Sequence, residues 1–596
     1  MRLVPVILGL LLLLTSISGA PPLPKIPAPP PILKLDDPRL ASLSTARAHW
    51  KEQTVRHRSV GDLVVLVSNV DTFLVAMSYW TPDLFFPILI EEPETTLRFI
   101  RAFQPAQIIR LPGAGPEAPS RWRGAQKALA AASYNLPPSL LLGNVLQDAR
   151  ATLRSDGLVL TSPDSPSFPG AIALAAGRFQ SVARFTSKIA AEEILTQDEA
   201  YSLATQVGQA VNLLYSHFDT LGDELDFLTI ALPWPDRYLG TENGRKTPFA
   251  LDDLIGRVGS SANRYAFVGR LSNSEPDSVY QAMCSLFLQP QKALLFNSYD
   301  TKIPPWSEYE MSSAAASLNP FCQTELFEGP DQGSRADWLH AAKRFSAHDL
   351  VMVNTSGSPT SFNLQEGNKA TTQDIPWSVP AAVFFIHSFS AARPWDDSTL
   401  AGRWLTNGAF LYFGALEEPY LQSFRTPRIL TELLAEGVPV AAAVHKVIGE
   451  DSFGQPWRLH LIGDPMYRLE PASIRERPRI HEGIRLPDGS VPVAASAASH
   501  ETANSSSRMQ TCWDTTLSQT ASQPGQDPGL PQQLAAIAAT NLNSTEQARY
   551  QTLLAELVVE SQESTWKPLV DAIPDPQRTG TLKRALEVRA TYGDLQ

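Results

Sequence analysis

One stretch, residues 380–413, constrains the fold of this chain more than any other. Its sequence, PAAVFFIHSFSAARPWDDSTLAGRWLTNGAFLYF, takes an apolar strand directly into a short polar turn and then a helix. In open α/β sheets, the carboxyl end of such a strand is where ligands and catalytic groups lie. The residues at this turn are His387, Ser388, Phe389 and Ser390. We therefore expect the functional site at this edge of a sheet.

The rest of the chain alternates between strand-like and helix-like segments. Around Asp62 the sequence GDLVVLVSNVDT begins with an apolar, β-branched strand, and a second apolar strand follows at Pro87 to Ile90. Helical spacing covers residues 94–103, and a third strand covers residues 106–110. Further strands are expected at 157–160, 226–232, 264–271, 292–299 and 349–353. Strands that alternate with helices predict an α/β fold with parallel sheets.

We expect two parallel-sheet α/β lobes in sequence, with extended or helical segments on either side. Residues 494–530 are rich in Ser, Thr, Ala, Gln and Pro, so burial of apolar surface there cannot offset the loss of conformational entropy. The predicted divisions are a signal peptide at 1–20, a Pro-rich linker at 21–58, an N-terminal α/β domain at 59–224, a second α/β domain at 225–471, a disordered linker at 472–530 and a helical tail at 531–596.

The amino terminus has the pattern of a secretory signal peptide. Arg2 precedes an uncharged, mostly apolar run from Val4 to Leu14, and Ser18 and Ala20 occupy the positions that a signal peptidase inspects. The alternative is an uncleaved anchor, but the run is well short of the roughly 20 residues that span a bilayer. The sequence predicts a secreted or periplasmic protein with no transmembrane segment after cleavage.

Composition excludes several classes of function. The formal net charge of -12 over 596 residues leaves no basic patch for phosphate contacts, so nucleic acid is not expected as a partner. Three cysteines are too few for a disulfide scaffold, although a bridge between Cys284 and Cys322 stays open. Zinc-binding motifs and Gly-rich nucleotide-binding loops are both missing from the sequence. We predict no metal and no cofactor.

Several short motifs in residues 225–471 follow one another in a recognisable order. A strand ends in Gly269 and Arg270, the strand at 349–353 is followed by Ser356 and Gly357, and LIGDPMYRL closes the region. Together with the turn after the 380s strand, this order resembles the gingipain-like cysteine peptidases, which have a caspase-type fold. The resemblance implies a caspase-like second lobe.

The same resemblance implies that the catalytic Cys-His dyad is absent. It places the nucleophilic cysteine at Phe389 and the catalytic histidine at Ser356. Phenylalanine has no nucleophilic atom, and serine cannot act as a base near neutral pH. The resemblance therefore predicts an exported, bacterial-type pseudoenzyme with no catalytic residues, which acts by binding a peptide or an envelope protein.

A different interpretation is a hydrolase with a site rebuilt at the same turn. Ser388 or Ser390 would be the nucleophile, and His387 would be the base. Successive residues of a strand point to opposite faces, and FIHSFSAARP contains no glycine of a nucleophile elbow. The alternative role of these serines is to cap the following helix.

Acidic residues beside the same turn are candidates for binding. Asp396 and Asp397 follow the turn next to Trp395, and Glu417 and Glu418 follow the next strand. By the resemblance, they would form a pocket for a basic group, whereas the simpler alternative is a solvated acidic rim.

A third interpretation is a scaffold protein that acts through the Pro-rich arm and the helical tail. The sequence predicts no oligomeric state.

Overall fold

The structure is a computed structural model that describes most of residues 58–593. The gaps are 114–119, 135–155, 187–188, 190–193, 216, 258–263, 330–331, 343–347, 447–454, 471–504, 523–527 and 538–541. The predicted signal peptide and, apart from Arg58, the predicted Pro-rich linker lie outside the described residues.

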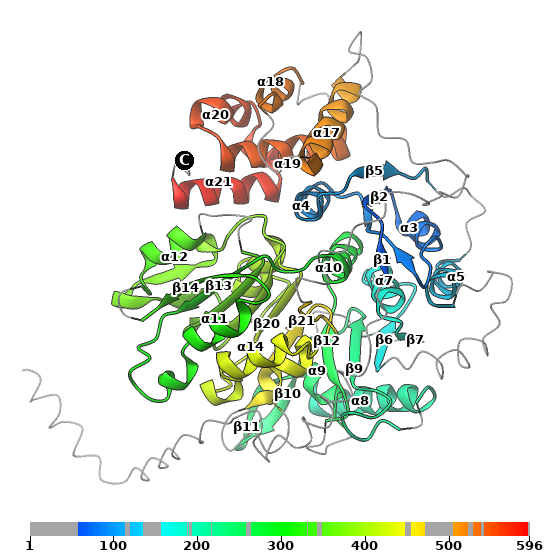
Figure 1. Cartoon of the computed structure of the whole chain (residues 1–596), viewed down its shortest axis with the longest axis vertical. Coiled ribbons are helices and arrows are strands. Elements are labelled where there is room, and N and C mark those ends of the chain that lie inside the picture. Colours follow the sequence, from blue (N-terminus) through cyan, green and yellow to red (C-terminus); the bar gives the residue numbers. More distant parts are fainter. Residues whose placement is uncertain are drawn as a thin grey trace, which may run out of the picture. The chain divides into compact units, whose positions relative to one another are not determined.

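A ten-stranded sheet forms the centre of the protein, in the order β14-β13-β15-β19-β20-β21-β12-β9-β6-β7 (Figure 1). All neighbouring pairs are parallel except β20 with β21. This finding confirms the predicted α/β class. The strands are β6 (Gly157–Thr161), β7 (Ser181–Arg184), β9 (Phe227–Ala231), β12 (Phe267–Arg270), β13 (Lys292–Asn297), β14 (Gln323–Glu328), β15 (Leu350–Asn354), β19 (Ala382–Ile386), β20 (Leu411–Ala415) and β21 (Leu459–Ile462).

A smaller parallel sheet, in the order β4-β2-β5, lies in the amino-terminal part of the described chain. Its central strand LVVLV is buried at every position, which explains why the sequence there is continuously apolar. The elements are β2 (Leu63–Val67), α3 (Val70–Met77), β4 (Ile88–Ile90), α4 (Pro93–Phe103), β5 (Gln107–Arg110) and α5 (Arg121–Tyr134), with a parallel pair β1 (Ser59–Val60) and β3 (Leu84–Phe85) beside them.

The large sheet extends across the predicted boundary at residue 224. Strand β6 pairs with β9, for example Gly157 with Phe227, so strands from both predicted domains share one sheet. Both strands are buried along their whole length, and burial of this kind does not reveal which strands pair. Pairing between distant segments is therefore a feature that only the folded chain reveals.

Helices α7 (Phe168–Arg178) and α10 (Glu275–Phe287) pack closely beside this sheet. Gly170 allows this approach, because a Cβ atom there would lie 2.3 Å from the carbonyl oxygen of Ser278. Both helices begin with proline in their first turn, where the missing N–H costs no hydrogen bond. The two helices join the small sheet to the large one, since α10 also contacts β4.

Two small three-stranded sheets are added at the loops: β11-β10-β8, which is mixed, and β16-β17-β18, which is antiparallel. Their strands are β8 (Leu195–Thr196), β10 (Arg237–Glu242), β11 (Arg245–Ala250), β16 (Gly357–Ser358), β17 (Ser361–Asn363) and β18 (Lys369–Thr371), with β8 parallel to β10. The other helices before residue 471 are α8 (Gln197–Asn212), α9 (Leu251–Ile255), α11 (Ser312–Leu318), α12 (Arg335–Ala342), α13 (Leu400–Thr406), α14 (Pro427–Ala435) and α15 (Val440–Val444), with short 3-10 turns that include η3 (Trp306–Tyr309), η4 (Gln365–Gly367), η5 (Thr372–Asp374), η6 (Leu421–Ser423) and η7 (Pro456–Arg458).

The C-terminal helices are α17 (Ser505–Ser522), α18 (Leu530–Ala535), α19 (Ser544–Glu560), α20 (Glu563–Asp571) and α21 (Gly580–Tyr592). Helix α17 lies inside the predicted disordered linker, so that prediction is wrong for this stretch. Met509, Trp513 and Leu517 repeat every fourth residue and are buried, with Cys512 beside them. This helical spacing is present in the sequence, but the polar composition around it obscures it.

The three cysteines are buried, and none of them takes part in a disulfide bond. The bridge that the sequence left open between Cys284 and Cys322 is therefore not formed. Within the described ranges, none of the helices is long and apolar enough to cross a membrane.

Candidate functional site

The candidate site lies at the carboxyl edge of the large sheet, where β13, β15, β19 and β20 end together. From β13 the chain moves outward to β14 and then returns to β15 on the other side of β13. The strand order therefore reverses between β13 and β15, which is the position where open α/β sheets usually bind ligands. The loops that leave three of these strands, β15, β19 and β20, carry all ten residues selected from the sequence. Figure 1 labels β14, β13 and β20 in this part of the sheet, and β15 and β19 lie between β13 and β20.

Ser356, the position expected for the catalytic histidine, follows β15 and is covered by the β16-β17-β18 meander. Its Oγ accepts a hydrogen bond from Asn363 Nδ2 at 2.9 Å, and its carbonyl accepts one from the Asn363 backbone at 2.7 Å. Gln365, just after β17, donates to the carbonyl of Ser298 in the loop after β13. The meander thus closes part of the edge with the chain's own groups.

His387 lies beneath the same meander and is 1% exposed. A Cβ atom on Gly357 would lie 2.6 Å from its Nε2, so the glycine leaves space for the imidazole ring. Neither ring nitrogen makes a hydrogen bond of acceptable geometry. Burial lowers the pKa of His387 to about 3, and the backbone groups of Ser361 and Ser356 oppose this shift only in part. His387 is therefore a neutral, enclosed side chain that makes no hydrogen bond to a serine hydroxyl.

Ser390 has a structural role in the same turn. It is fully buried, and its Oγ accepts a hydrogen bond from the backbone N–H of Ala415 at 3.2 Å. Its carbonyl accepts from the Tyr412 hydroxyl at 3.2 Å. The hydroxyl is therefore used to join the turn to β20. Ser388 is half-buried.

Phe389, the position expected for the cysteine, adopts a left-handed backbone conformation with φ of 62°. Bulky residues rarely adopt this conformation, and strained residues of this kind cluster at functional sites. The N–H of Phe389 points to the carbonyl of Glu417 at 3.4 Å, so the loops after β19 and β20 are in direct contact. Tyr420 in the second loop has the same φ of 62°.

The buried imidazole of His387 leads to a testable pH dependence. Its pKa is about 3 in the folded chain and about 6.5 when unfolded, so only the unfolded chain takes up the proton between these values. The free energy of unfolding should therefore fall as the pH drops below 6.5. For this one group we expect a loss of about 2 kcal/mol between pH 8 and pH 5, measured by urea denaturation.

H387L should lack this part of the pH dependence. Burial also lowers the pKa of His445 to about 3, and this residue contributes equally to the pH dependence of the wild type and of H387L. H217Q is the matched control because His217 is exposed. Parallel pH profiles for the wild type and H387L would contradict the assignment.

The four carboxylates do not all form one pocket. Asp396 accepts hydrogen bonds from Ser398 and pairs with Arg393 at 3.1 Å, and the bonds from Ser398 lower its pKa. These contacts are local to its own loop, and Asp397 is exposed. The acidic-rim alternative thus describes this pair.

Glu417 and Glu418 are half-buried at the edge itself. Glu418 accepts from the N–H of Tyr420 at 2.9 Å. Burial raises the pKa of Tyr299, its hydrogen bond with Ser356 lowers it, and the charge of Glu418 raises it further. Glu418, Tyr299 and Ser356 are therefore neighbours from the loops after β20, β13 and β15.

Apolar side chains at this edge were not selected from the sequence, apart from Trp395. Five large hydrophobic residues are exposed in the described part of the chain, and three of them follow β13, β19 and β20: Ile303 (49%), Trp395 (38%) and Tyr420 (44%). Trp306 stacks on Tyr299 with ring centroids 5.4 Å apart. The sequence feature that indicates exposed apolar side chains at this edge is KIPPW, an apolar loop that follows the strand predicted at 292–299.

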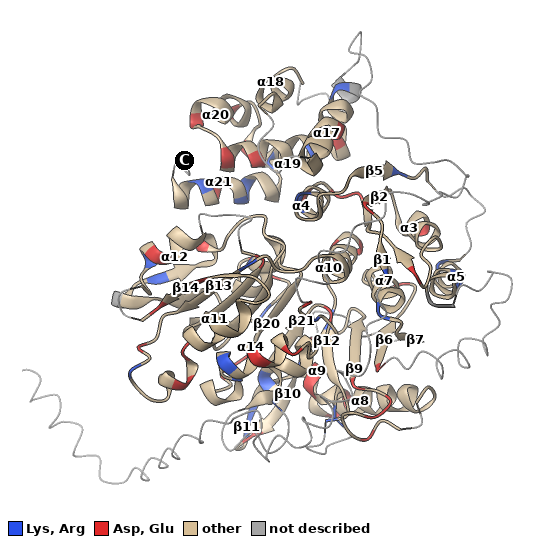
Figure 2. Ribbon diagram, in the orientation of Figure 1, with Lys and Arg blue, Asp and Glu red and all other residues tan. Residues whose placement is uncertain are grey.

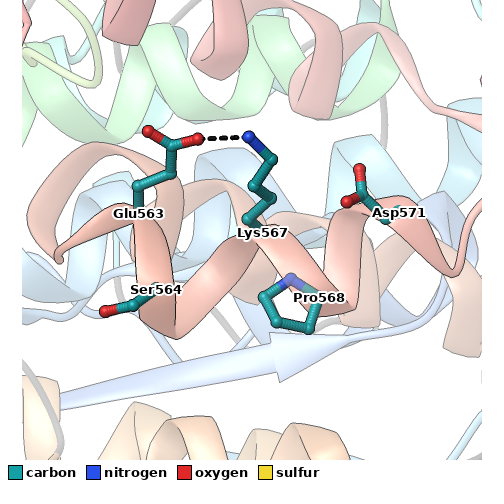
Figure 3. Close-up of a pocket in the computed structure, with 5 residues that line it drawn as sticks. All are labelled: Glu563, Ser564, Lys567, Pro568 and Asp571. Atoms are coloured by element: carbon teal, nitrogen blue, oxygen red, sulfur yellow. Dashed lines mark hydrogen bonds and ion pairs between the residues drawn. The ribbon is translucent and has the colours of Figure 1, made fainter.

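A shallow pocket of about 470 Å³ lies elsewhere, on α20 (Figure 3). Its lining residues belong to that helix, and Lys567 pairs with Glu563 across one turn at 2.5 Å. An i,i+4 pair on an exposed helix face is ordinary surface structure. Among the described residues, no group of three or more His, Cys, Asp or Glu side chains is placed to hold a metal ion.

Comparisons with known proteins give little further information. No protein-family model matches the chain, and no curated protein matches it significantly. A solved structure described as "Structure of Protease" matches with a TM-score of 0.36 and 10% identity, covering 54% of this chain and 79% of that chain. The chain thus has a distant structural neighbour that is a protease, at a level of similarity that establishes neither a shared fold nor an activity.

Proposed function

We propose that this chain is an exported, gingipain-like pseudoenzyme that binds a peptide or an envelope protein at the carboxyl edge of its large sheet. The observation that carries the binding role is the concentration of exposed Ile303, Trp395 and Tyr420 on the loops of this edge. Exposed apolar groups gathered on one face are typical of interaction sites. Export rests on the signal-peptide pattern of residues 1–20.

The loss of peptidase activity is supported by the chemistry of the edge. Phe389 and Ser356 lack the thiolate and the imidazole of the resembled dyad. The rebuilt hydrolase site is not favoured, because His387 is enclosed and makes no hydrogen bond to a serine hydroxyl. The scaffold role is not favoured either, because the C-terminal helices contact α4 of the same chain.

Binding can be tested with an immobilised library of 12-residue peptides. We expect a selected peptide to bind the wild type, and I303S and Y420S each to weaken binding about tenfold in fluorescence anisotropy, as anchor residues do. I194S and L213S are matched controls, because Ile194 and Leu213 are hydrophobic residues outside the edge that are more exposed than Ile303 and Tyr420. Equal losses in the two sets would refute the proposed site.

The same purified protein should be treated with serine- and thiol-directed activity probes. We expect no adduct in mass spectrometry. An adduct on Ser388, Ser390 or Cys284 would instead identify a nucleophile and replace the pseudoenzyme with the hydrolase.

A further inference from the structure

The helices α17 to α21 form a unit that packs mainly on itself. Helix α19 contacts α17, α18, α20 and α21, and its inner face is fully buried. Contacts with the preceding part of the chain are limited mainly to α4, β5 and η5. Figure 1 shows these helices together beside α4. We call residues 505–592 the C-terminal unit.

Ion pairs connect this unit to the rest of the chain, and each side contributes both arginines and carboxylates. Glutamates of the body bind arginines of the C-terminal unit, and arginines of the body bind carboxylates of the unit. We call these five pairs the ionic seam: Glu91–Arg549 (3.1 Å), Glu94–Arg584 (2.8 Å), Arg101–Glu556 (2.5 Å), Arg110–Asp514 (2.5 Å) and Arg403–Glu587 (3.0 Å). Figure 2 shows charged residues of both signs on α19 and α21.

Glu91 has three partner side chains at the seam. Its carboxylate also accepts from Arg110 and from the indole N–H of Trp513 at 2.7 Å. Burial raises the pKa of Glu91, but Arg110, Arg549 and Trp513 together outweigh burial and lower it. The charged form of Glu91 is therefore stabilised by Arg110 of the body and, in addition, by Arg549 and Trp513 of the C-terminal unit.

The seam also connects two separate parts of the body. Glu91, Glu94 and Arg101 lie in or beside α4 next to the small sheet, whereas Arg403 belongs to α13 beside the large sheet. At the far end of the unit, Tyr592 donates to the carbonyl of Asp374 in η5 at 2.7 Å. Apolar side chains of the unit join the same core, so the seam determines the orientation of docking and adds to its strength.

We propose that the C-terminal unit is a detachable module, docked on α4, β5 and η5 of its own chain by the ionic seam and released as a whole when the seam is weakened. Interfaces between units of one chain resemble transient interfaces and open unless they are large and apolar. Salt screens exposed ion pairs most strongly, and the most exposed members of the seam are Arg110–Asp514 and Arg403–Glu587. The module is independent of the binding role proposed for the sheet edge.

Native-state hydrogen exchange of the full chain, read by mass spectrometry, tests this proposal. In 0.05 M NaCl, R101E and E556R should each speed exchange in α19 and α21 about tenfold, while β13 and β15 keep their protection. The double variant R101E/E556R restores opposite charges and should recover most of that loss. Raising NaCl to 1 M should speed exchange in the wild-type helices in the same direction.

R428E is the matched control, because Arg428 pairs with Glu432 inside α14 and takes no part in the seam. It should leave exchange in α19 and α21 unchanged. Loss of protection in β13 and β15 together with the helices would overturn the proposal, since the unit would then not be separable. A double variant no better than the single variants would overturn it as well.

Discussion

R270M is expected to lower the free energy of unfolding by about 3–5 kcal/mol, because it leaves a buried carboxylate without its cation. Arg270 ends β12 and is fully buried; its guanidinium donates to Asp252 at 2.5 Å and to the carbonyls of Trp234 at 2.6 Å and Pro235 at 3.0 Å. Burial raises the pKa of Asp252, but Arg270 and His460 reverse this effect and hold it far below its usual range.

Urea denaturation of R270M, followed by fluorescence, measures this loss. The double variant D252L/R270M removes both charges and should be at least 2 kcal/mol more stable than R270M, since apolar replacement of a buried pair costs roughly nothing. The surface control is R393M, whose exposed pair with Asp396 should contribute less than about 1 kcal/mol. A loss in R270M no larger than in R393M would show that the buried pair is unimportant.

D464A is expected to cost about 2–3 kcal/mol, since it removes the acceptor of several buried hydrogen bonds at once. Asp464 follows β21 in the Gly-Asp-Pro turn and is 1% exposed. It accepts from Arg178 Nε at 3.0 Å, from Ser285 Oγ at 2.6 Å and from the Met466 N–H at 2.9 Å. One side chain thus ties the turn to α7 and α10.

D464N provides a graded comparison for this position, because the amide keeps an oxygen for the Met466 N–H and loses the charge that Arg178 requires. We expect its free energy of unfolding to lie between those of the wild type and D464A in the same denaturation experiment. Equal values for D464N and D464A would mean that the charge on Asp464 accounts for the whole effect and the turn hydrogen bond for none.

The sequence predicted those strands and helices whose apolar runs or helical spacing are visible within a single short segment. Strand β2 is continuously apolar, α4 has helical spacing, and the residues before Ser356 and His387 form strands that end where the sequence predicts. The parallel arrangement followed from the alternation of strands and helices. It placed the turn at residues 387–390 at the carboxyl edge before any contact was known.

Contacts between distant segments were not predictable in the same way. The meander after residue 356 covers His387 because Gly357 leaves room for the ring, and that space depends on a segment about 30 residues away. The exposure of Ile303, Trp395 and Tyr420 on one edge likewise requires three strands to be neighbours in the sheet. For helix α17, the helical spacing of the apolar residues is visible in the sequence. The stability of this helix nevertheless depends on burial against α4 and α19.

The sequence by itself determined the α/β class and the approximate positions of the strands, because each depends on residue types and local spacing. Only the tertiary structure decided that the large sheet crosses the predicted domain boundary, that His387 is enclosed and that the C-terminal unit docks on its own chain. These features depend on which distant surfaces meet, and apolar burial favours such contacts without specifying the partner in the local sequence.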